Sequence, residues 1–188
     1  MLHRAYGRYL TEKKKELDKT DNVYWEKLFS NGFAFEAPSL SDTGASFGDS
    51  GITSKLDIDN ELVVDYEKLC SENGVTLFTG ILSAVFISIY AVTGRTSVTA
   101  IVPFTDRIDF SGEQPFGMFI DDMLIYVELE SNDSFESILK KVMQSFMASY
   151  KAGSASMYSA LKKSGLESEY YTNRLSLPFF DIESCNQE

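Results

Sequence analysis

Histidine is almost absent from this chain, and its scarcity excludes more chemistry than any other feature of the composition. The 188 residues include a single histidine, His3, close to the amino terminus. One histidine so close to the terminus nearly excludes a Ser-His-Asp triad, a histidine metal cluster and histidine acid–base chemistry from this chain alone. Gly-rich phosphate loops are also missing, because neither G-x-G-x-x-G nor G-x-x-x-x-G-K-[ST] occurs. The serines therefore have no evident base to activate them.

Basic side chains and cysteines are few as well. Seventeen Lys and Arg against 28 Asp and Glu give a net charge of −11. Such an anionic surface repels phosphate backbones and acidic lipids, so we expect neither a nucleic-acid partner nor a membrane partner. Two cysteines, Cys70 and Cys185, cannot form a disulfide framework and indicate a reducing compartment. The amino terminus has no apolar run behind its charges, as a signal peptide would, so the sequence predicts a cytoplasmic location.

One long uncharged run, residues 75–93, has two interpretations. Its length approaches the ~20 residues of a membrane-spanning helix. Small and polar residues form a stripe along it, and Gly74 and Gly94 bracket it without a flanking basic cluster. These features favour a core helix buried on all sides.

The chain divides by pattern into helices and a linker at 1–32, a loop at 33–51 and an α/β core at 52–188, which we expect to form a single lobe. Phe33, Phe35 and Phe47 are the expected anchors of the loop. The expected core elements, in order, are a half-buried strand at 52–58, a helix from residue 59 or 60 that stops at Gly74, the apolar helix at 75–93, a buried strand at 96–104, a long loop at 105–121, a strand at 123–129, a helix from Asp133 to the break at 152–154, a short helix at 156–164 and a last strand at 177–182. This order predicts a mixed β-sheet flanked by helices.

Two features invite a chemical interpretation. The pair Asp121-Asp122 could hold a metal or act as paired carboxylates, but neighbours entering a strand point to opposite faces. A solvated or capping pair is therefore favoured. Cys70 lies beside Leu69 on the buried side of its expected helix, which suits a packed thiol better than a nucleophile. These residues assign no catalytic group and no metal ligand.

Several short motifs occur in a fixed order along the chain. They are Tyr6-Gly-Arg-Tyr9, Tyr24-Trp25-Glu-Lys-Leu28, Gly74-Val-Thr-Leu-Phe78 with Thr93-Gly94, Pro103 with Arg107, and Gly117-Met118-Phe119-Ile120-Asp121. Together they resemble the motifs Y-x-x-Y, Y-W-x-x-x-L, G-x-T-x-F, P-x-x-x-R and G-x-F-V-N-T of nonribosomal peptide synthetase condensation domains. The resemblance is to the second, C-terminal lobe of these domains.

This resemblance implies one lobe of a fold like that of chloramphenicol acetyltransferase, with a reaction tunnel between two lobes. It implies transfer of a carrier-bound acyl or peptidyl thioester to an amine, as in peptide bond formation for secondary metabolites. The tunnel or motif positions would be Gly117, Phe119, Asp121 and Asp122. The implied partners are the missing N-terminal lobe and carrier proteins with phosphopantetheine arms; no cofactor is bound directly. Since the H-H-x-x-x-D-G motif of the first lobe is absent, we expect the chain to be inactive alone.

The chain departs from the family where Asp121-Asp122 replaces Asn-Thr and where Tyr126 occupies the region of a common arginine. These departures support an alternative, a non-catalytic condensation-like module that docks carrier proteins. We also expect a weak homo-oligomer, because a lobe without its partner exposes apolar surface. Its expected contact is the aromatic loop that includes Phe119.

Overall fold

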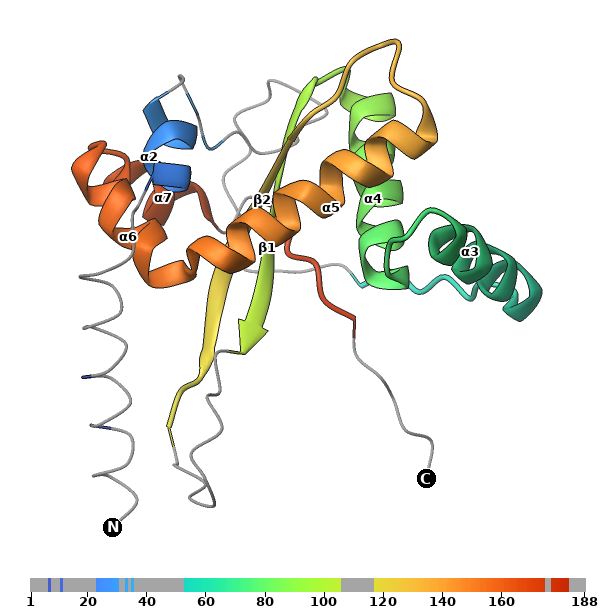
Figure 1. The fold of residues 1–188 in the computed structure, drawn as a ribbon, viewed down its shortest axis with the longest axis horizontal. Coiled ribbons are helices and arrows are strands. Elements are labelled where there is room, and N and C mark those ends of the chain that lie inside the picture. Colours follow the sequence, from blue (N-terminus) through green and yellow to red (C-terminus); the bar gives the residue numbers. More distant parts are fainter. Residues whose placement is uncertain are drawn as a thin grey trace. The chain divides into compact units, whose positions relative to one another are not determined.

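The computed structural model describes residues 7, 11, 23–30, 33, 35, 53–105, 117–174 and 177–182. The elements in chain order are α2 (Val23–Ser30), α3 (Asn60–Glu72), α4 (Leu77–Thr93), β1 (Ser97–Thr105), β2 (Ile120–Glu128), α5 (Phe135–Ala152), α6 (Ser154–Lys163) and α7 (Glu167–Asn173) (Figure 1). They form two compact units. Unit 1 comprises Met1–Ala37, Thr99–Tyr126 and Gln144–Glu188, and unit 2 comprises Pro38–Val98 and Val127–Met143. Of the expected helices and linker at 1–32, the structure describes Gly7, Thr11 and residues 23–30, all of which are helical.

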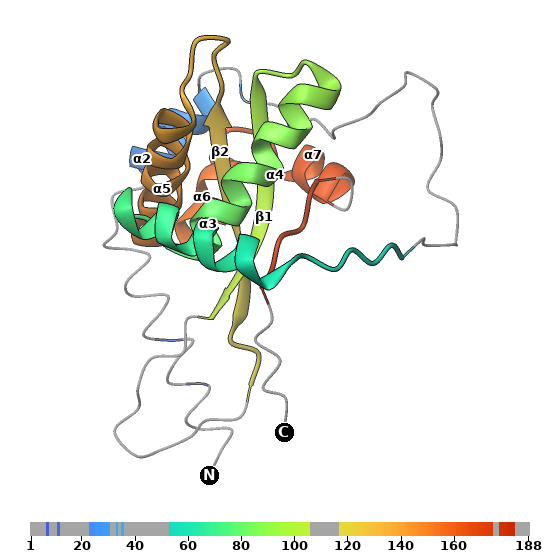
Figure 2. The same cartoon turned by 90° about the vertical axis from the view of Figure 1, so that its right-hand side faces the viewer.

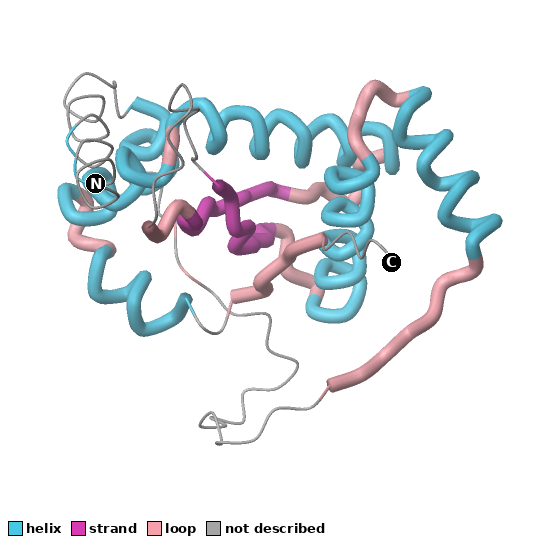
Figure 3. Tube along the Cα trace, turned by 90° about the horizontal axis from the view of Figure 1, so that it is seen from below, coloured by secondary structure: helices cyan, strands magenta, loops and turns pink. Residues whose placement is uncertain are grey.

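The sheet confirms the predicted mixed α/β class. β1 and β2 lie side by side (Figure 3). The N–H of Leu129 donates to the carbonyl of Thr96 at 2.7 Å, which joins the end of β2 to the start of β1 as in an antiparallel pair. Five consecutive residues of β1, from Val98 to Val102, are buried, as expected for a strand covered on both faces.

The expected last strand at 177–182 is reduced to a single parallel bridge between Ile101 and Phe179. Ile101 donates to the carbonyl of Pro178 at 2.8 Å and accepts from Phe180 at 2.9 Å. Continuing this ladder on either side would need the N–H groups of residues 103 and 178. Both residues are prolines, which have no N–H, so the pairing stops after one bridge.

The other edge of the sheet is closed by side chains of α5. Since Leu129 faces β1, the alternate residues 128, 126 and 124 of β2 turn their backbone groups to the outer edge. The Ser145 hydroxyl accepts from the N–H of Tyr126 at 3.2 Å and donates to its carbonyl at 2.8 Å. Ser149 donates to the carbonyl of Leu124 at 2.8 Å, and Lys141 donates to the carbonyl of Glu128 at 3.2 Å. Four residues rise ~6 Å along a helix, and two residues rise ~6.6 Å along a strand. Side chains four residues apart in α5 therefore meet backbone groups two residues apart in β2.

The core of unit 1 is aromatic and is built around Trp25, which is fully buried. The Trp25 ring stacks on Phe29 with ring centroids 5.8 Å apart, and its Nε1 donates to the carbonyl of Gly153 at 3.0 Å. Phe33 and Phe35 are buried in the same cluster, which confirms two of the expected loop anchors. Phe47 lies outside the described residues. Long-range contacts of α2 with the α5–α6 junction therefore fix this short helix.

Unit 2 is built on a close approach of α3 to α4. Asp59 caps α3, Thr76 caps α4, and Gly94 ends α4 in the left-handed conformation, as glycine allows. At the crossing the Tyr66 hydroxyl donates to the carbonyl of Gly80 at 2.7 Å. A Cβ at position 80 would lie 2.3 Å from the Cys70 sulfur, so the contact requires glycine.

The prediction that the 75–93 run is a helix is confirmed, but the expectation that it is buried on all sides is wrong. In α4 the buried residues are Thr79, Gly80, Leu82, Ser83 and Phe86, and the remaining side chains are half-buried or exposed. The buried stripe follows the contacts with α3 and with Met143 of α5. No described helix alone is long and apolar enough to cross a membrane; α3 and α4 meet that criterion together, but they are bent by 102°.

The predicted strand at 52–58 is wrong for its described part. Residues 53–58 form no strand, and every side chain there is exposed, although the alternation that suggested a strand is real. A strand requires a partner, and no partner strand pairs with this segment among the described residues. Helix α7 was not predicted from the sequence. Its signal was the glycine at 165 followed by Glu167 and Glu169 in the first turn.

Candidate functional site

The four sequence-predicted positions lie together at the entry of β2 in unit 1. Gly117 is exposed, Phe119 is buried, and Asp121 and Asp122 are half-buried. The expectation that Phe119 lies on an exposed apolar face is therefore wrong, because its side chain is 5% exposed. Its neighbours Met118 and Ile120 are exposed instead, at 73% and 60%. Residues that alternate along extended backbone point to opposite sides, which explains this pattern.

The two carboxylates of this segment have different partners. The Ser154 hydroxyl donates to Asp121 Oδ2 at 2.6 Å. Asp122 Oδ2 accepts from the Tyr170 hydroxyl at 3.2 Å and forms an ion pair with the Arg174 guanidinium. Asp121 and Asp122 are thus not simply solvated, and they do not share one ligand, because each carboxylate binds different side chains. Together they fasten the start of β2 to α6 and to α7 with its C-terminal cap.

Tyr170 contacts both charged partners of the cluster, the Asp122 carboxylate and the Arg174 guanidinium. It is fully buried, and burial raises the pKa of its hydroxyl well above the ordinary value, so the hydroxyl remains a hydrogen-bond donor. The Arg174 guanidinium lies 5.7 Å from the centroid of the Tyr170 ring, within cation–π range. Tyr158 packs edge-on against the same ring at 5.9 Å, and burial raises its pKa as well. A cation, a neutral phenol and a carboxylate therefore form a compact and satisfied cluster.

Sequence reasoning found the carboxylates of this cluster but not their partners. Ser154, Tyr170 and Arg174 follow Asp121 and Asp122 by 33, 48 and 52 residues. No local pattern links residues so far apart. The only available signal was an arginine placed shortly after a tyrosine-rich helix.

Cys70 in unit 2 is a packed thiol, as predicted. It is fully buried, and burial, aided by the charge of Glu67, raises its pKa. A thiol with a raised pKa is a poor nucleophile. Within the described part of the chain, no three His, Cys, Asp or Glu side chains come close enough to hold a metal ion.

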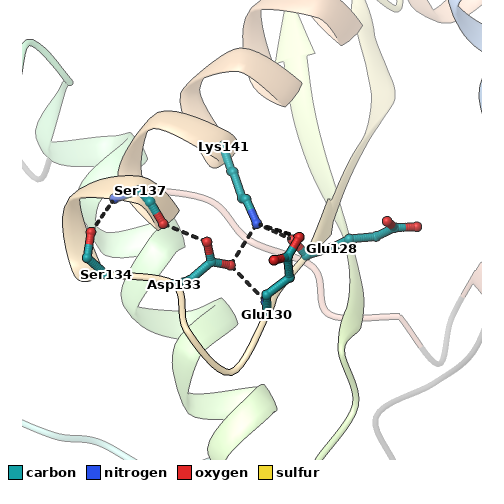
Figure 4. A network of polar contacts seen from close by, with 6 residues as sticks. All are labelled: Glu128, Glu130, Asp133, Ser134, Ser137 and Lys141. Carbon is teal, nitrogen blue, oxygen red and sulfur yellow. Dashed lines mark hydrogen bonds and ion pairs between the residues drawn. The ribbon is translucent and has the colours of Figure 1, made fainter.

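A second polar cluster closes the turn between β2 and α5 in unit 2 (Figure 4). Asp133 accepts from the Glu130 N–H at 2.8 Å, from the Ser137 hydroxyl at 2.6 Å and from Lys141 Nζ at 2.7 Å. These bonds, the one from Lys141 above all, lower the pKa of Asp133 to about 2. The cluster fixes the start of α5 and directs Lys141 to the carbonyl of Glu128.

With this geometry in view, the comparisons with known proteins decide the family. The family model "Condensation domain" matches residues 2–187, nearly the whole chain. The chain belongs to the condensation-domain family. This result confirms the resemblance found in the sequence motifs.

The curated relatives of this chain include a gramicidin S synthase and a nonribosomal peptide synthetase. It is 23% identical over 184 residues to gramicidin S synthase 2 of Brevibacillus brevis, covering 93% of this chain and 4% of that protein. It is 25% identical over 142 residues to nonribosomal peptide synthetase kk1B of Curvularia clavata, covering 75% of this chain and 1% of that protein.

A solved structure shows the same fold. The first condensation domain of the calcium-dependent antibiotic synthetase, in complex with substrate analogue 3a, superposes with a TM-score of 0.59 and 15% identity. The match covers 94% of this chain and 36% of that structure. This chain therefore spans about a third of the solved chain that it matches and a few per cent of the curated relatives.

Proposed function

We propose that this chain is part of the second lobe of a nonribosomal peptide synthetase condensation domain. It would form one wall of the tunnel in which a carrier-bound acyl or peptidyl thioester is transferred to an amine. The match of the condensation-domain family to residues 2–187 supports the family, and the order of the motifs between Tyr6 and Asp121 supports the second lobe. The chain supplies no base, because His3 is its one histidine and is not part of an H-H-x-x-x-D-G motif. The base would come from the first lobe.

In the proposed reaction a C–N bond forms between the amine and the acyl carbon, and the C–S bond to the phosphopantetheine thiol breaks. The first-lobe histidine takes the proton lost by the amine and passes it to the leaving thiolate, which departs as the thiol of the carrier. The contribution of this chain would be positional. Met118 and Ile120 would present apolar side chains to the acyl group and the pantetheine arm. Asp121 and Asp122 would hold the wall by anchoring β2 to α6 and α7.

The alternative is a non-catalytic module that retains the fold to dock carrier proteins. The observation in its favour is the Asp122–Arg174 ion pair, which stands where the family motif has threonine. A threonine there could not balance the guanidinium. In this chain the side chain at position 122 would therefore serve to hold the start of β2 against α7.

The test uses donor and acceptor carriers loaded with an acyl group and an amino acid, with product followed by mass spectrometry. The isolated chain should give no product above a no-protein control. A fusion behind the first lobe of the matching gramicidin S synthase 2 domain should give product. Replacing the second histidine of its H-H-x-x-x-D-G motif by alanine should abolish that product.

Two matched variants of this chain test whether Ile120 lines the proposed tunnel. Within the fusion, Ile120→Asp should reduce product strongly, whereas Ile58→Asp, an equally exposed isoleucine in unit 2, should not. Product formed by the isolated chain would contradict the proposal. A folded fusion that binds carriers without forming product would favour the docking module.

A further inference from the structure

Residues 53–59, which lead into α3 (Figure 2), have the alternating pattern of a strand but pair with no described strand. All seven side chains are exposed, including Leu56 at 84% and Ile58 at 57%. From Thr53 to Ile58, no backbone group is hydrogen-bonded to another described residue. An exposed extended segment with free N–H and C=O groups is a template for pairing with another strand.

Both outer edges of the β1–β2 sheet are already occupied in part, so they are poor partners for residues 53–59 as a third strand. The outer edge of β2 is occupied by Lys141, Ser145 and Ser149 of α5. At the outer edge of β1, Ile101 is bonded to residues 178 and 180. Pro103 on that edge has no N–H to offer. A partner for the segment must therefore come from outside these two strands.

The segment reads Thr-Ser-Lys-Leu-Asp-Ile-Asp, and its central residues 55–57 are complementary to themselves when two copies run antiparallel about Leu56. Lys55 then lies opposite the partner's Asp57, and Asp57 opposite the partner's Lys55. On the other face Leu56 meets the partner's Leu56. Opposite charges and apolar pairs placed directly across antiparallel strands are stabilising. Within one chain Lys55 Nζ already lies 3.1 Å from Asp57 Oδ1, so both side chains occupy the same face.

We propose that residues 53–59 of two copies pair antiparallel about Leu56 and form a two-fold symmetric dimer. One register satisfies both charge pairs and the Leu56–Leu56 contact at once, which specifies a closed, isologous contact. Leu62, 60% exposed near the start of α3, adds apolar surface beside it. An isolated two-stranded ribbon is only marginally stable and each chain carries a charge of −11, so the association is weak. The surface lies in unit 2, whereas the candidate site lies in unit 1.

Sedimentation velocity over a concentration series at constant salt tests the dimer through charge reversal. Lys55→Asp places a carboxylate opposite the partner's Asp57 in both symmetry-related pairs and should weaken association by about ten-fold. Lys68→Asp is the matched control, since it makes the same change of net charge on exposed α3 and should alter association by no more than about two-fold. The double variant Lys55→Asp, Asp57→Lys exchanges the charges and should restore association to near the original level.

A chain that remains monomeric throughout the series overturns the proposal. Equal weakening by Lys55→Asp and Lys68→Asp also overturns it, because net charge alone would then explain the effect. The same holds if the exchanged double variant fails to recover. Amide hydrogen exchange provides a second measurement: protection of residues 53–59 should rise with protein concentration. Protection that is independent of concentration would mean that another part of the chain covers the segment, which overturns the proposal as well.

Discussion

Gly80→Ala is the sharpest test of how α3 and α4 meet, because the structure reverses the usual effect of this substitution. In an ordinary helix interior, alanine is more stable than glycine by about 1 kcal/mol. Here the new methyl group would lie 2.3 Å from the Cys70 sulfur and 3.2 Å from Tyr66 Cε1. Forced overpacking costs about 1–3 kcal/mol, and strain on the Tyr66–Gly80 hydrogen bond costs about 1 kcal/mol more. We expect the free energy of unfolding to fall by about 1–3 kcal/mol.

The measurement is the midpoint of chemical denaturation. Ser88→Ala, at an exposed position of the same helix, is the control and should change stability by less than about 0.5 kcal/mol. Cys70→Ala removes the clashing sulfur, so the double variant with Gly80→Ala should be less destabilised than the sum of the two single variants. If Gly80→Ala alone leaves the midpoint unchanged or raises it, the close approach of α3 to α4 is refuted.

Three further predictions concern the other contacts of the fold. Trp25→Ala removes a fully buried ring and should destabilise the chain by about 3–5 kcal/mol; an unchanged denaturation midpoint would show that α2 is not docked. Ser145→Ala removes the acceptor of the Tyr126 N–H, so that amide should exchange faster in hydrogen-exchange experiments, and equal rates would disprove the closure of the edge. Since the folded-state pKa of Asp133 is lowered to about 2, its contribution to stability is present above pH ~4 and is lost as the pH falls towards 2. Asp133→Asn should therefore flatten the loss of stability between pH ~4 and pH ~2 in acid denaturation, and an unaltered acid profile would contradict the network.

The sequence by itself determined the features that depend on local chemistry. The cap at Asp59, the stops at Gly74 and Gly94 and the break at Gly153 follow from backbone preferences, so the boundaries of α3, α4, α5 and α6 were predicted within a few residues. The single histidine, close to the amino terminus, makes an independent histidine-based catalytic centre an unfavourable interpretation on composition alone. The motif order indicated the family, because short motifs in a fixed order need no knowledge of contacts.

What only the tertiary structure decided depends on residues far apart in the chain. Residues 53–58 have the alternation of a strand, but a strand forms only where another segment offers its backbone groups. The partners of Asp122 follow it by 48 and 52 residues, and no local rule selects them. The serines of α5 have the pattern of polar helix positions, yet their spacing of four matches alternate residues of β2 and closes the sheet edge. Hydrogen bonds and overpacking depend on two atoms that come close in space. A local sequence pattern identifies one of these atoms but does not say which distant residue supplies the other.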